Sequence, residues 1–523
     1  MAVALLFLLL TAVGLWTVDD YTGSYDEIAE QAILASNMKE YALGLEKLGI
    51  RCHYWLSSQA VEISQSVERD HGISGYYLYG LLFPLLENSE TLRYMIWSMM
   101  TWMWFMFGVW SLYALAREIG MNRPISCLAT MMLYLSPRFF ADGHFNNKDV
   151  VLLCLMLATL WLGVRFLKRM SVGRGMLFSF VGALATNTKI VAAMAWGLMI
   201  GGAAVMLIAQ KEWKKNRIVV LGMTITGFAG FYLLLTPAMW SNPIGFFTYL
   251  FTNATAFSRW SGTLFFRGAS FKIPENPLPL YYLGYMMLVT LPVHTFPLCA
   301  VGQISVLRRF IKAPRAFLAS PNGIVLGAST LCWVISMAAF VVFRPLVYNG
   351  WRHFYFTFAG LAVLGGVGIG TLWKLCSCQN WLKRVWAAAL AFCFVSTAIG
   401  MIINHPRQSS YYNMLSGSSV METDYWNTSG TYALDRLIAC EERNKDLPLE
   451  VGCYFFDIQN ARFKFNDEQK AVLTTTVQKD SPYLYFIENY VQVYGIPKPE
   501  GYHVLFKVEG YGRVLGTMYE RDT

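Results

Sequence analysis

Charged residues are scarce in this sequence. They make up 14% of its 523 residues, whereas soluble globular chains carry roughly 25%. The deficit extends over most of the chain, which excludes a soluble body held by a single membrane anchor. Apolar residues take the place of charge: 55% are hydrophobic and 15% are aromatic, a composition typical of a protein with two membrane interfaces.

The sequence also lacks the ligand spacing of a zinc site. Cys376 and Cys378 form a C-x-C pair with no His or further Cys nearby, whereas structural zinc takes a complete set of Cys and His ligands. We therefore predict no metal site, although dispersed Asp and His residues could still meet in space, and dependence on a divalent metal stays open. No long internal repeat is visible, which weighs against a transporter built from repeated halves.

Long apolar runs, by contrast, are abundant. A membrane-spanning helix needs about 20 mostly apolar residues, and about eleven segments are candidates, of which Ala4–Trp16, Ile125–Leu135, Val150–Val164 and Gly175–Thr186 are shorter. The first, Ala4–Trp16, has no basic residue before it and no clear cleavage site after it, so we predict an uncleaved helix and not a signal peptide. The other segments are Tyr94–Ala116, Ile125–Leu135, Val150–Val164, Gly175–Thr186, Ile190–Gln210, Ile218–Trp240, Leu280–Leu307, Gly323–Phe343, Phe354–Trp373 and Val385–Ile403.

Basic residues predict on which side of the membrane each loop lies. If the N-terminus is cytoplasmic, every second connection is basic and almost free of acid. The positive-inside pattern is thereby repeated five times, which predicts a multi-pass protein of the plasma (inner) membrane. It also explains the net charge of +9 without a nucleic acid partner. The cations are Arg117 and Arg123; Arg165, Lys168, Arg169 and Arg174; Lys211, Lys214, Lys215 and Arg217; Arg308, Arg309, Lys312 and Arg315; and Lys374, Lys383 and Arg384.

The opposite, extracytoplasmic side receives the long polar segments. The first outer loop covers about 18–92 and is expected to contain short helices. Residues 1–404 are predicted to form the transmembrane domain. Residues 405–523 are predicted to form a small soluble α/β domain, because a helical pattern is followed there by short apolar runs. The last of these runs, before Gly510-Tyr-Gly512, predicts a β-hairpin.

Two acidic pairs follow the first apolar segment: Asp19-Asp20 and Asp26-Glu27. A carboxylate near the low-dielectric membrane boundary can have a raised pKa and serve as a base. A solvated acidic loop leading into the first turn of a helix explains the same residues, and loop composition alone favours that interpretation.

Three further polar segments lie on the same side: Asp142–Asp149, the region of Lys189, and Arg352 with His353. A capped turn, a lysine at a helix end and interfacial aromatic residues would account for them structurally. As a site, their cations would hold a phosphate at headgroup depth, and a carboxylate would deprotonate an acceptor hydroxyl. Several cations converge on this side, among them Arg138, Lys148, Lys189, Arg267 and Arg352.

Several motifs, taken with this arrangement, resemble a known family. The chain resembles the type-C glycosyltransferases, and more narrowly the protein O-mannosyltransferase-like glycosyltransferase family 39 and its bacterial relatives. The resemblance covers nearly the whole chain and is weakest beyond about residue 440. The motifs are Tyr25-Asp26-Glu27, Asn147-Lys148-Asp149, Tyr348-Asn-Gly-Trp351-Arg352-His353, Asn404-His405-Pro, Tyr411-Tyr412-Asn413 and Glu422-Thr-Asp424-Tyr425-Trp426.

The resemblance implies a membrane glycosyltransferase that moves a hexosyl or pentosyl group from a polyprenyl-phosphate donor to an acceptor hydroxyl at the outer face. The acceptor would be a protein, a lipid or a glycan, and no cofactor is certain. The implied roles are these: Asp26 as catalytic base with Glu27 beside it; Lys148, Lys189 and Arg352 on the donor phosphate, with His353 adjacent; and Asp142, His144 and Asp149 lining the cavity.

Departures from the family pattern leave alternatives open. Asp19-Asp20 competes with Asp26 for the role of base, and Asn349 stands where the family segment has Asp. A transporter or flippase of lipid-linked or anionic substrates explains the helix count and Lys189 as well. A lipid-linked polymerase or ligase would share the same architecture.

Overall fold

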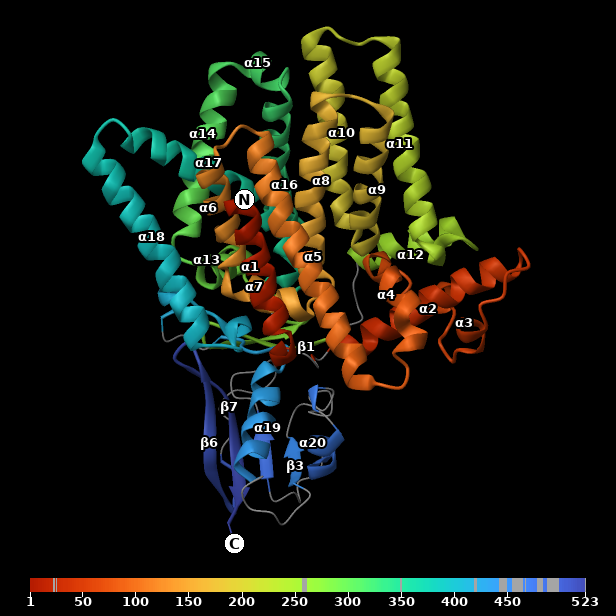
Figure 1. The fold of residues 1–523 in the computed structure, drawn as a ribbon, viewed down its shortest axis with the longest axis vertical. Helices are drawn as coiled ribbons and strands as arrows, with labels where there is room; N and C mark the ends of the chain where they lie inside the picture. The colour runs from red at the N-terminus through yellow and green to blue at the C-terminus, as the bar shows by residue number, and fades with distance from the viewer. Residues whose placement is uncertain are drawn as a thin grey trace.

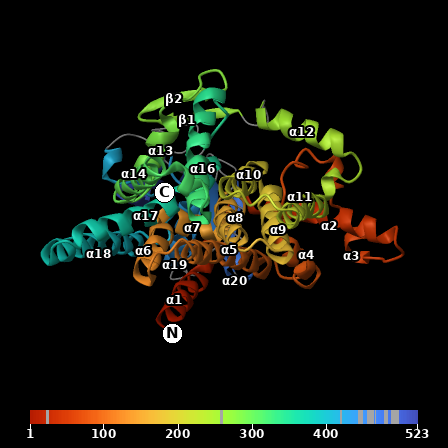
Figure 2. The ribbon, with the colours of Figure 1, turned by 90° about the horizontal axis from the view of Figure 1, so that it is seen from above.

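The computed structural model has two parts, a bundle of helices and a smaller domain with a β-sheet at one end of it (Figure 1). It describes residues 1–21, 24, 26–255, 261–348, 350–417, 421–441, 449–453, 464–465, 467–476, 483–486 and 498–522. Seen from above, α18 (Asn380–Ile403) extends from one flank of the bundle, and α2 (Glu27–Glu46) with α3 (His53–Ser57) extends from the other (Figure 2).

A helix lies in each of the eleven segments that the sequence predicts to be apolar spans. Among the described residues, seven helices are long and apolar enough to cross a membrane, and the pair α13 (Tyr282–Thr290) and α14 (Thr295–Lys312), bent by 116°, makes an eighth candidate. The helical membrane architecture is therefore confirmed, whereas the count of eleven spans stays a prediction. The helices are α1 (Ala2–Trp16), α5 (Glu90–Glu118), α6 (Arg123–Tyr134), α8 (Asp149–Lys168), α9 (Val172–Thr188), α10 (Ala193–Gln210), α11 (Lys215–Leu235), α13 (Tyr282–Thr290), α14 (Thr295–Lys312), α16 (Pro321–Phe343), α17 (Phe358–Cys376) and α18.

Small residues let the helices approach closely. A Cβ atom at Gly302 of α14 would lie 1.8 Å from the carbonyl oxygen of Leu364 in α17, and one at Gly368 would lie 1.9 Å from that of Leu298. Only glycine tolerates such an approach, which is common between membrane helices. The most deeply buried span is α8, at 89% of its apolar window. Its N-terminal end is therefore held firmly by the surrounding helices.

Short helices fill the segment between α1 and α5. Here α2 begins after its N-cap residue Asp26, so the second acidic pair lies at a helix N-terminus, where carboxylates are favoured by the helix dipole. Another short helix, α7, precedes α8. The short elements are η1 (Val18–Tyr21), α3, η2 (Ile63–Gln65), η3 (Ser74–Tyr76), α4 (Tyr77–Leu82), η4 (Phe83–Leu85) and α7 (Pro137–Phe145).

The C-terminal domain contains a five-stranded sheet of order β4-β3-β5-β7-β6. Its last two strands pair antiparallel, which confirms the predicted hairpin. The hydrophobic core of the domain also includes Leu264 and Ile273 from the small hairpin β1–β2, which ties it to the membrane part. The elements are β1 (Gly262–Phe266), β2 (Ala269–Ile273), α19 (Thr428–Glu441), β3 (Leu449–Cys453), α20 (Asp467–Val472), β4 (Leu473–Thr476), β5 (Tyr483–Phe486), β6 (Tyr502–Gly510) and β7 (Arg513–Arg521).

The two ends of the bundle differ. The connections α10–α11, α14–α16 and α17–α18, all of them basic, lie at the end opposite the C-terminal domain (Figure 1). The N-terminal ends of α2 and α8 lie at the end that the domain covers. The alternation of basic and polar loops in the sequence thus corresponds to two opposite ends of the molecule.

Candidate active site

Asp26 is held by residues from distant parts of the chain. Its Oδ2 lies 3.1 Å from Nη1 of Arg352, and the hydroxyl of Tyr425 donates to its Oδ1 at 2.9 Å. Arg352 comes from η7 (Arg352–Thr357), and its Nη2 also donates to the Tyr425 hydroxyl at 3.1 Å. The side chain of Asp26 keeps 30% of its surface exposed while that of Arg352 keeps 9%. Asp26 is therefore a positioned carboxylate that remains accessible.

A second ion pair joins α8 to the end of α9. Lys189 donates to Asp149, and a quarter of its side chain is exposed. Asn146 organises the turn before α8, because its Oδ1 accepts from the backbone N–H of Asp149 at 2.8 Å and its Nδ2 donates to Asp142 at 3.2 Å. An ammonium group has three donors, so Lys189 can bind an anion while it still contacts Asp149.

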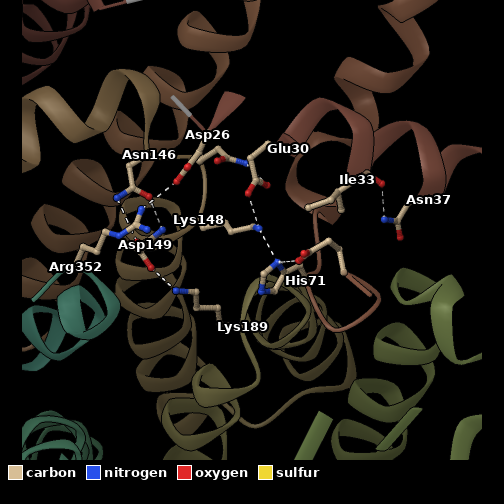
Figure 3. Close-up of polar contacts among 12 residues, drawn as sticks. Asp26, Glu30, Ile33, Asn37, His71, Asn146, Lys148, Asp149, Lys189 and Arg352 are labelled. Carbon is tan, nitrogen blue, oxygen red and sulfur yellow. Dashed lines mark hydrogen bonds and ion pairs between the residues drawn. The ribbon is translucent and has the colours of Figure 1, made fainter. Parts of the chain in front are cut away.

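A third ion pair joins α2 to the turn before α8. Nζ of Lys148 lies 2.5 Å from Oε1 of Glu30 and 3.1 Å from Nδ1 of His71, and Asn147 donates to the other oxygen of Glu30 at 3.1 Å. The three ion pairs lie beside one another (Figure 3). Three carboxylates thus face three cations, an arrangement that can exchange partners when an anionic ligand binds.

Glu30 was missed by reasoning from sequence alone. The signal was present, since residues four apart share one face of a helix and Glu30 is four residues after Asp26. Tyr425 belongs to a motif that carries the resemblance, but no role was predicted for it from the sequence.

Not every predicted site residue joins this network. Glu27 is 1% exposed and lies 3.5 Å from the hydroxyl of Ser98 in α5. The ring of His144 is stacked between Tyr21 and Trp102, and its two nitrogens lie 2.9 and 3.1 Å from the carbonyl oxygens of Phe140 and Gly14.

Packing therefore accounts for the positions of Glu27 and His144. Burial lowers the pKa of His144 to about 4, so its ring is neutral at physiological pH.

His353 and Arg267 also lie outside the ion pairs. The ring of His353 packs edge-on against Tyr348 with centroids 4.6 Å apart. Arg267 lies in the turn of the β1–β2 hairpin and over the ring of Tyr285. Tyr25 and Asn349, two residues of the motifs that carry the resemblance, lie outside the described residues.

A buried polar cavity adjoins the network. Asp142, Arg352 and Tyr425 line it together with Arg138 and Glu422. Burial raises the pKa values of Asp142 and Glu422 to about 7, because it outweighs the hydrogen bonds and the charge of Arg138, which lower both values. The cavity thus holds two carboxyl groups that titrate near neutral pH.

The competing acidic pair has different partners. Oδ2 of Asp20 lies 2.9 Å from Nε2 of His405, and its Oδ1 lies 3.9 Å from Nζ of Lys464. The neighbouring Tyr21 donates to Gln408 at 2.5 Å. These contacts join η1 to the segment after α18 and to the C-terminal domain.

Metal-ligating side chains do not gather in the part of the chain that the structure describes. Among those residues, no group of three or more His, Cys, Asp or Glu side chains could hold a metal ion. The carboxylates of the site face Lys and Arg side chains in their ion pairs.

A family model matches residues 70–240, and together with the apolar helices this match supports a membrane glycosyltransferase with a type-C fold. The model is described as dolichyl-phosphate-mannose-protein mannosyltransferase. The match covers about a third of the chain, and it includes Lys148, Asp149 and Lys189 but neither Asp26 nor Arg352. No curated protein matches the chain.

Proposed function

We propose that this protein transfers a sugar from a polyprenyl-phosphate donor to an acceptor hydroxyl, at the extracytoplasmic face of the plasma membrane. The observation that carries the proposal is the position of Asp26, an accessible carboxylate fixed by Arg352 and Tyr425 beside two further ion pairs. A lipid-borne phosphate arrives at headgroup depth, where the ends of these helices present their cations.

The reaction needs one base. Asp26 accepts the proton of the acceptor hydroxyl, and the hydroxyl oxygen forms a bond to the anomeric carbon of the donor. The bond between that carbon and the phosphate oxygen breaks, and its electron pair leaves with the lipid phosphate. Phosphate departs as an anion with little protonation, so a second carboxyl group acting as an acid, as in glycoside hydrolysis, is not required.

The cations stabilise the charge that grows on the phosphate. Lys189 and Lys148 are partly accessible and each has a carboxylate partner in the free protein. When the donor binds, its phosphate oxygens take up the remaining N–H donors of these ammonium groups. Fixed donors aimed at developing charge are an effective means of lowering a barrier.

The test is transfer by the purified protein. The protein is reconstituted in lipid nanodiscs and incubated with labelled polyprenyl-phosphate mannose, glucose, galactose or arabinose, and with envelope fractions of cells that lack the protein as acceptors. We expect label to move to an acceptor with the wild type and not with Asp26→Asn. Transport of the lipid across proteoliposomes without any covalent product would instead support a flippase.

The orientation can be tested with two native cysteines. Cys378 lies in the basic connection between α17 and α18, Cys440 lies in α19, and both are exposed and free. We expect a membrane-impermeant maleimide to label Cys440 in spheroplasts and Cys378 only after lysis. The reverse pattern would place the site in the cytoplasm.

A further inference from the structure

The polar cavity beside the ion pairs is built from three separate segments. Arg138 and Asp142 come from α7, Tyr355 comes from η7, and Glu422 and Thr423 come from the segment between α18 and α19. The cavity measures about 30 Å³, which is room for about two water-sized groups. The edge of a larger ligand, not a whole ring, fits a space of this size.

Several polar atoms around this cavity have no partner among the described residues. Arg138 is 9% exposed, and while its Nε donates to the carbonyl of Tyr411 at 3.0 Å, its Nη2 has no hydrogen-bond acceptor. Glu422 is 6% exposed, and while its Oε2 accepts from Gly350 N–H at 2.9 Å, its Oε1 has no donor. The buried hydroxyl of Thr423 is also unsatisfied.

Buried polar groups are nearly always hydrogen-bonded, and burying a charged group without a partner is unfavourable. Here a strong donor, a strong acceptor and a hydroxyl lie around one small space. A ligand that satisfies all three must both donate and accept. Neighbouring hydroxyl groups on a sugar ring do both.

The cavity lies within reach of both halves of the proposed reaction. Arg352 and Tyr425 line it and are the two residues that hold Asp26. Asp142 also lines it and is connected through Asn146 to Asp149 and Lys189. The sugar of a lipid-phosphate donor must lie between its phosphate and the base, and residues that line this cavity contact or connect to both Asp26 and Lys189.

We infer that the cavity is the subsite that recognises the hydroxyl groups of the transferred sugar, with Arg138 donating to one hydroxyl and Glu422 accepting from its neighbour. The inference rests on the proposed function, since it names the part of the donor that this site reads. Glu422 and Arg138 are then specificity residues, distinct from the base and from the phosphate-binding cations.

The test separates the sugar from the phosphate. The dissociation constant of the purified protein is measured for polyprenyl phosphate without a sugar and for polyprenyl-phosphate mannose, glucose and galactose. For each sugar, the dissociation constant for polyprenyl phosphate is divided by that for the glycosylated lipid, and this ratio reports the contribution of the sugar alone. For at least one sugar we expect the wild type to bind the glycosylated lipid about tenfold or more tightly, because charge-assisted hydrogen bonds are strong.

Four variants then identify the source of this preference. Glu422→Gln, which keeps the shape of the side chain, should bring the ratio to within about threefold of one, and Thr423→Val should lower it by less. Lys189→Ala should weaken binding of both lipids and leave the ratio unchanged. Glu509→Gln, a change of the same type at an exposed position in β6, is the control and should change neither constant.

Two results would overturn the inference. One is a wild-type ratio near one for every sugar. The other is a ratio that stays unchanged in folded Glu422→Gln and Thr423→Val. The second result would mean that the cavity is a solvated structural site. Failure of the proposed function looks different. In that case the wild type would keep its sugar-dependent binding and the effect of Glu422→Gln, but would transfer no sugar.

Discussion

The two acidic pairs after the first helix are similar in sequence, but the fold gives them different partners. Asp20 contacts His405 and Lys464, so it joins the membrane part to the C-terminal domain. Asp26 contacts Arg352 and Tyr425, so it lies in the candidate site. The difference teaches that a carboxylate near a membrane helix end becomes a site residue only through the partners that the fold brings to it.

The same lesson holds within the second pair. Successive residues of an α-helix point about 100° apart, so Asp26 and Glu27 cannot share one environment. Asp26 faces the accessible site, whereas Glu27 is buried against α5. Glu30, one turn further, returns to the face of Asp26 and binds Lys148.

Replacement of the base should have the largest effect on this comparison. We expect Asp26→Asn to reduce the transfer rate by about 100- to 10,000-fold, the usual contribution of a general base, because the amide keeps the shape but accepts no proton. Initial rates of transfer from the lipid-phosphate donor measure the effect. Asp20→Asn is the matched control and should stay within about threefold of the wild type. Equal losses in the two variants would remove the distinction between the pairs.

The next largest effect should come from removing a cation of the candidate site, compared with removing a cation that contacts Asp20. We expect Lys189→Ala to weaken binding of polyprenyl phosphate by about tenfold or more, since a hydrogen bond to a charged group contributes roughly 1.5–3 kcal/mol. Lys464→Ala, which removes a cation from the contacts of Asp20 and Asp435, should leave this affinity unchanged. Equilibrium binding to the purified proteins tests both. A loss of affinity only in Lys464→Ala would move the phosphate site to the other region.

His144 should behave as a packing residue. Phenylalanine at this position keeps the stack with Tyr21 and Trp102 but loses the hydrogen bond that the single N–H of the neutral imidazole donates to a backbone carbonyl. We expect His144→Phe to lower stability by about 1–3 kcal/mol, the cost of leaving a buried polar group unpaired. Thermal unfolding measures this change, and the transfer rate per folded molecule should be retained. If the variant were fully stable but had lost transfer, His144 would have a role in the reaction and not only in packing.

The smallest effect is a dependence of stability on pH. Burial opposes ionisation of Asp20, but its hydrogen bond with His405 and the nearby positive charge outweigh burial and lower the pKa of Asp20 below its usual value. A carboxylate with a lowered pKa stabilises the folded state above its unfolded pKa of about 3.9, and this contribution is lost as the pH falls below that value. Asp20 is 42% exposed, so solvent screening keeps the effect small.

Thermal unfolding from pH 6 to pH 3 tests this point. The wild type should lose more stability across the acidic part of the range than Asp20→Asn does. Parallel curves for the two proteins would show that the contact with His405 contributes nothing.

Much of this protein could be predicted from local patterns. Apolar runs of helix length and the alternation of basic loops determine the helical membrane part, because hydropathy and charge act residue by residue on insertion into a bilayer. The turn at Gly510 to Gly512 was enough to predict the last hairpin. The match over residues 70–240 agrees with the class that the motifs suggested.

Only the tertiary structure decided which polar residues meet. Arg352 and Tyr425 lie 326 and 399 residues from Asp26 along the chain, a separation at which no local pattern carries information. The partners of Glu30 and the unsatisfied atoms of Arg138 and Glu422 likewise follow from packing between segments. The sequence by itself therefore determined the membrane architecture and the types of residue available, and the fold decided which carboxylate meets which cation, because electrostatic partnership depends on distance in space.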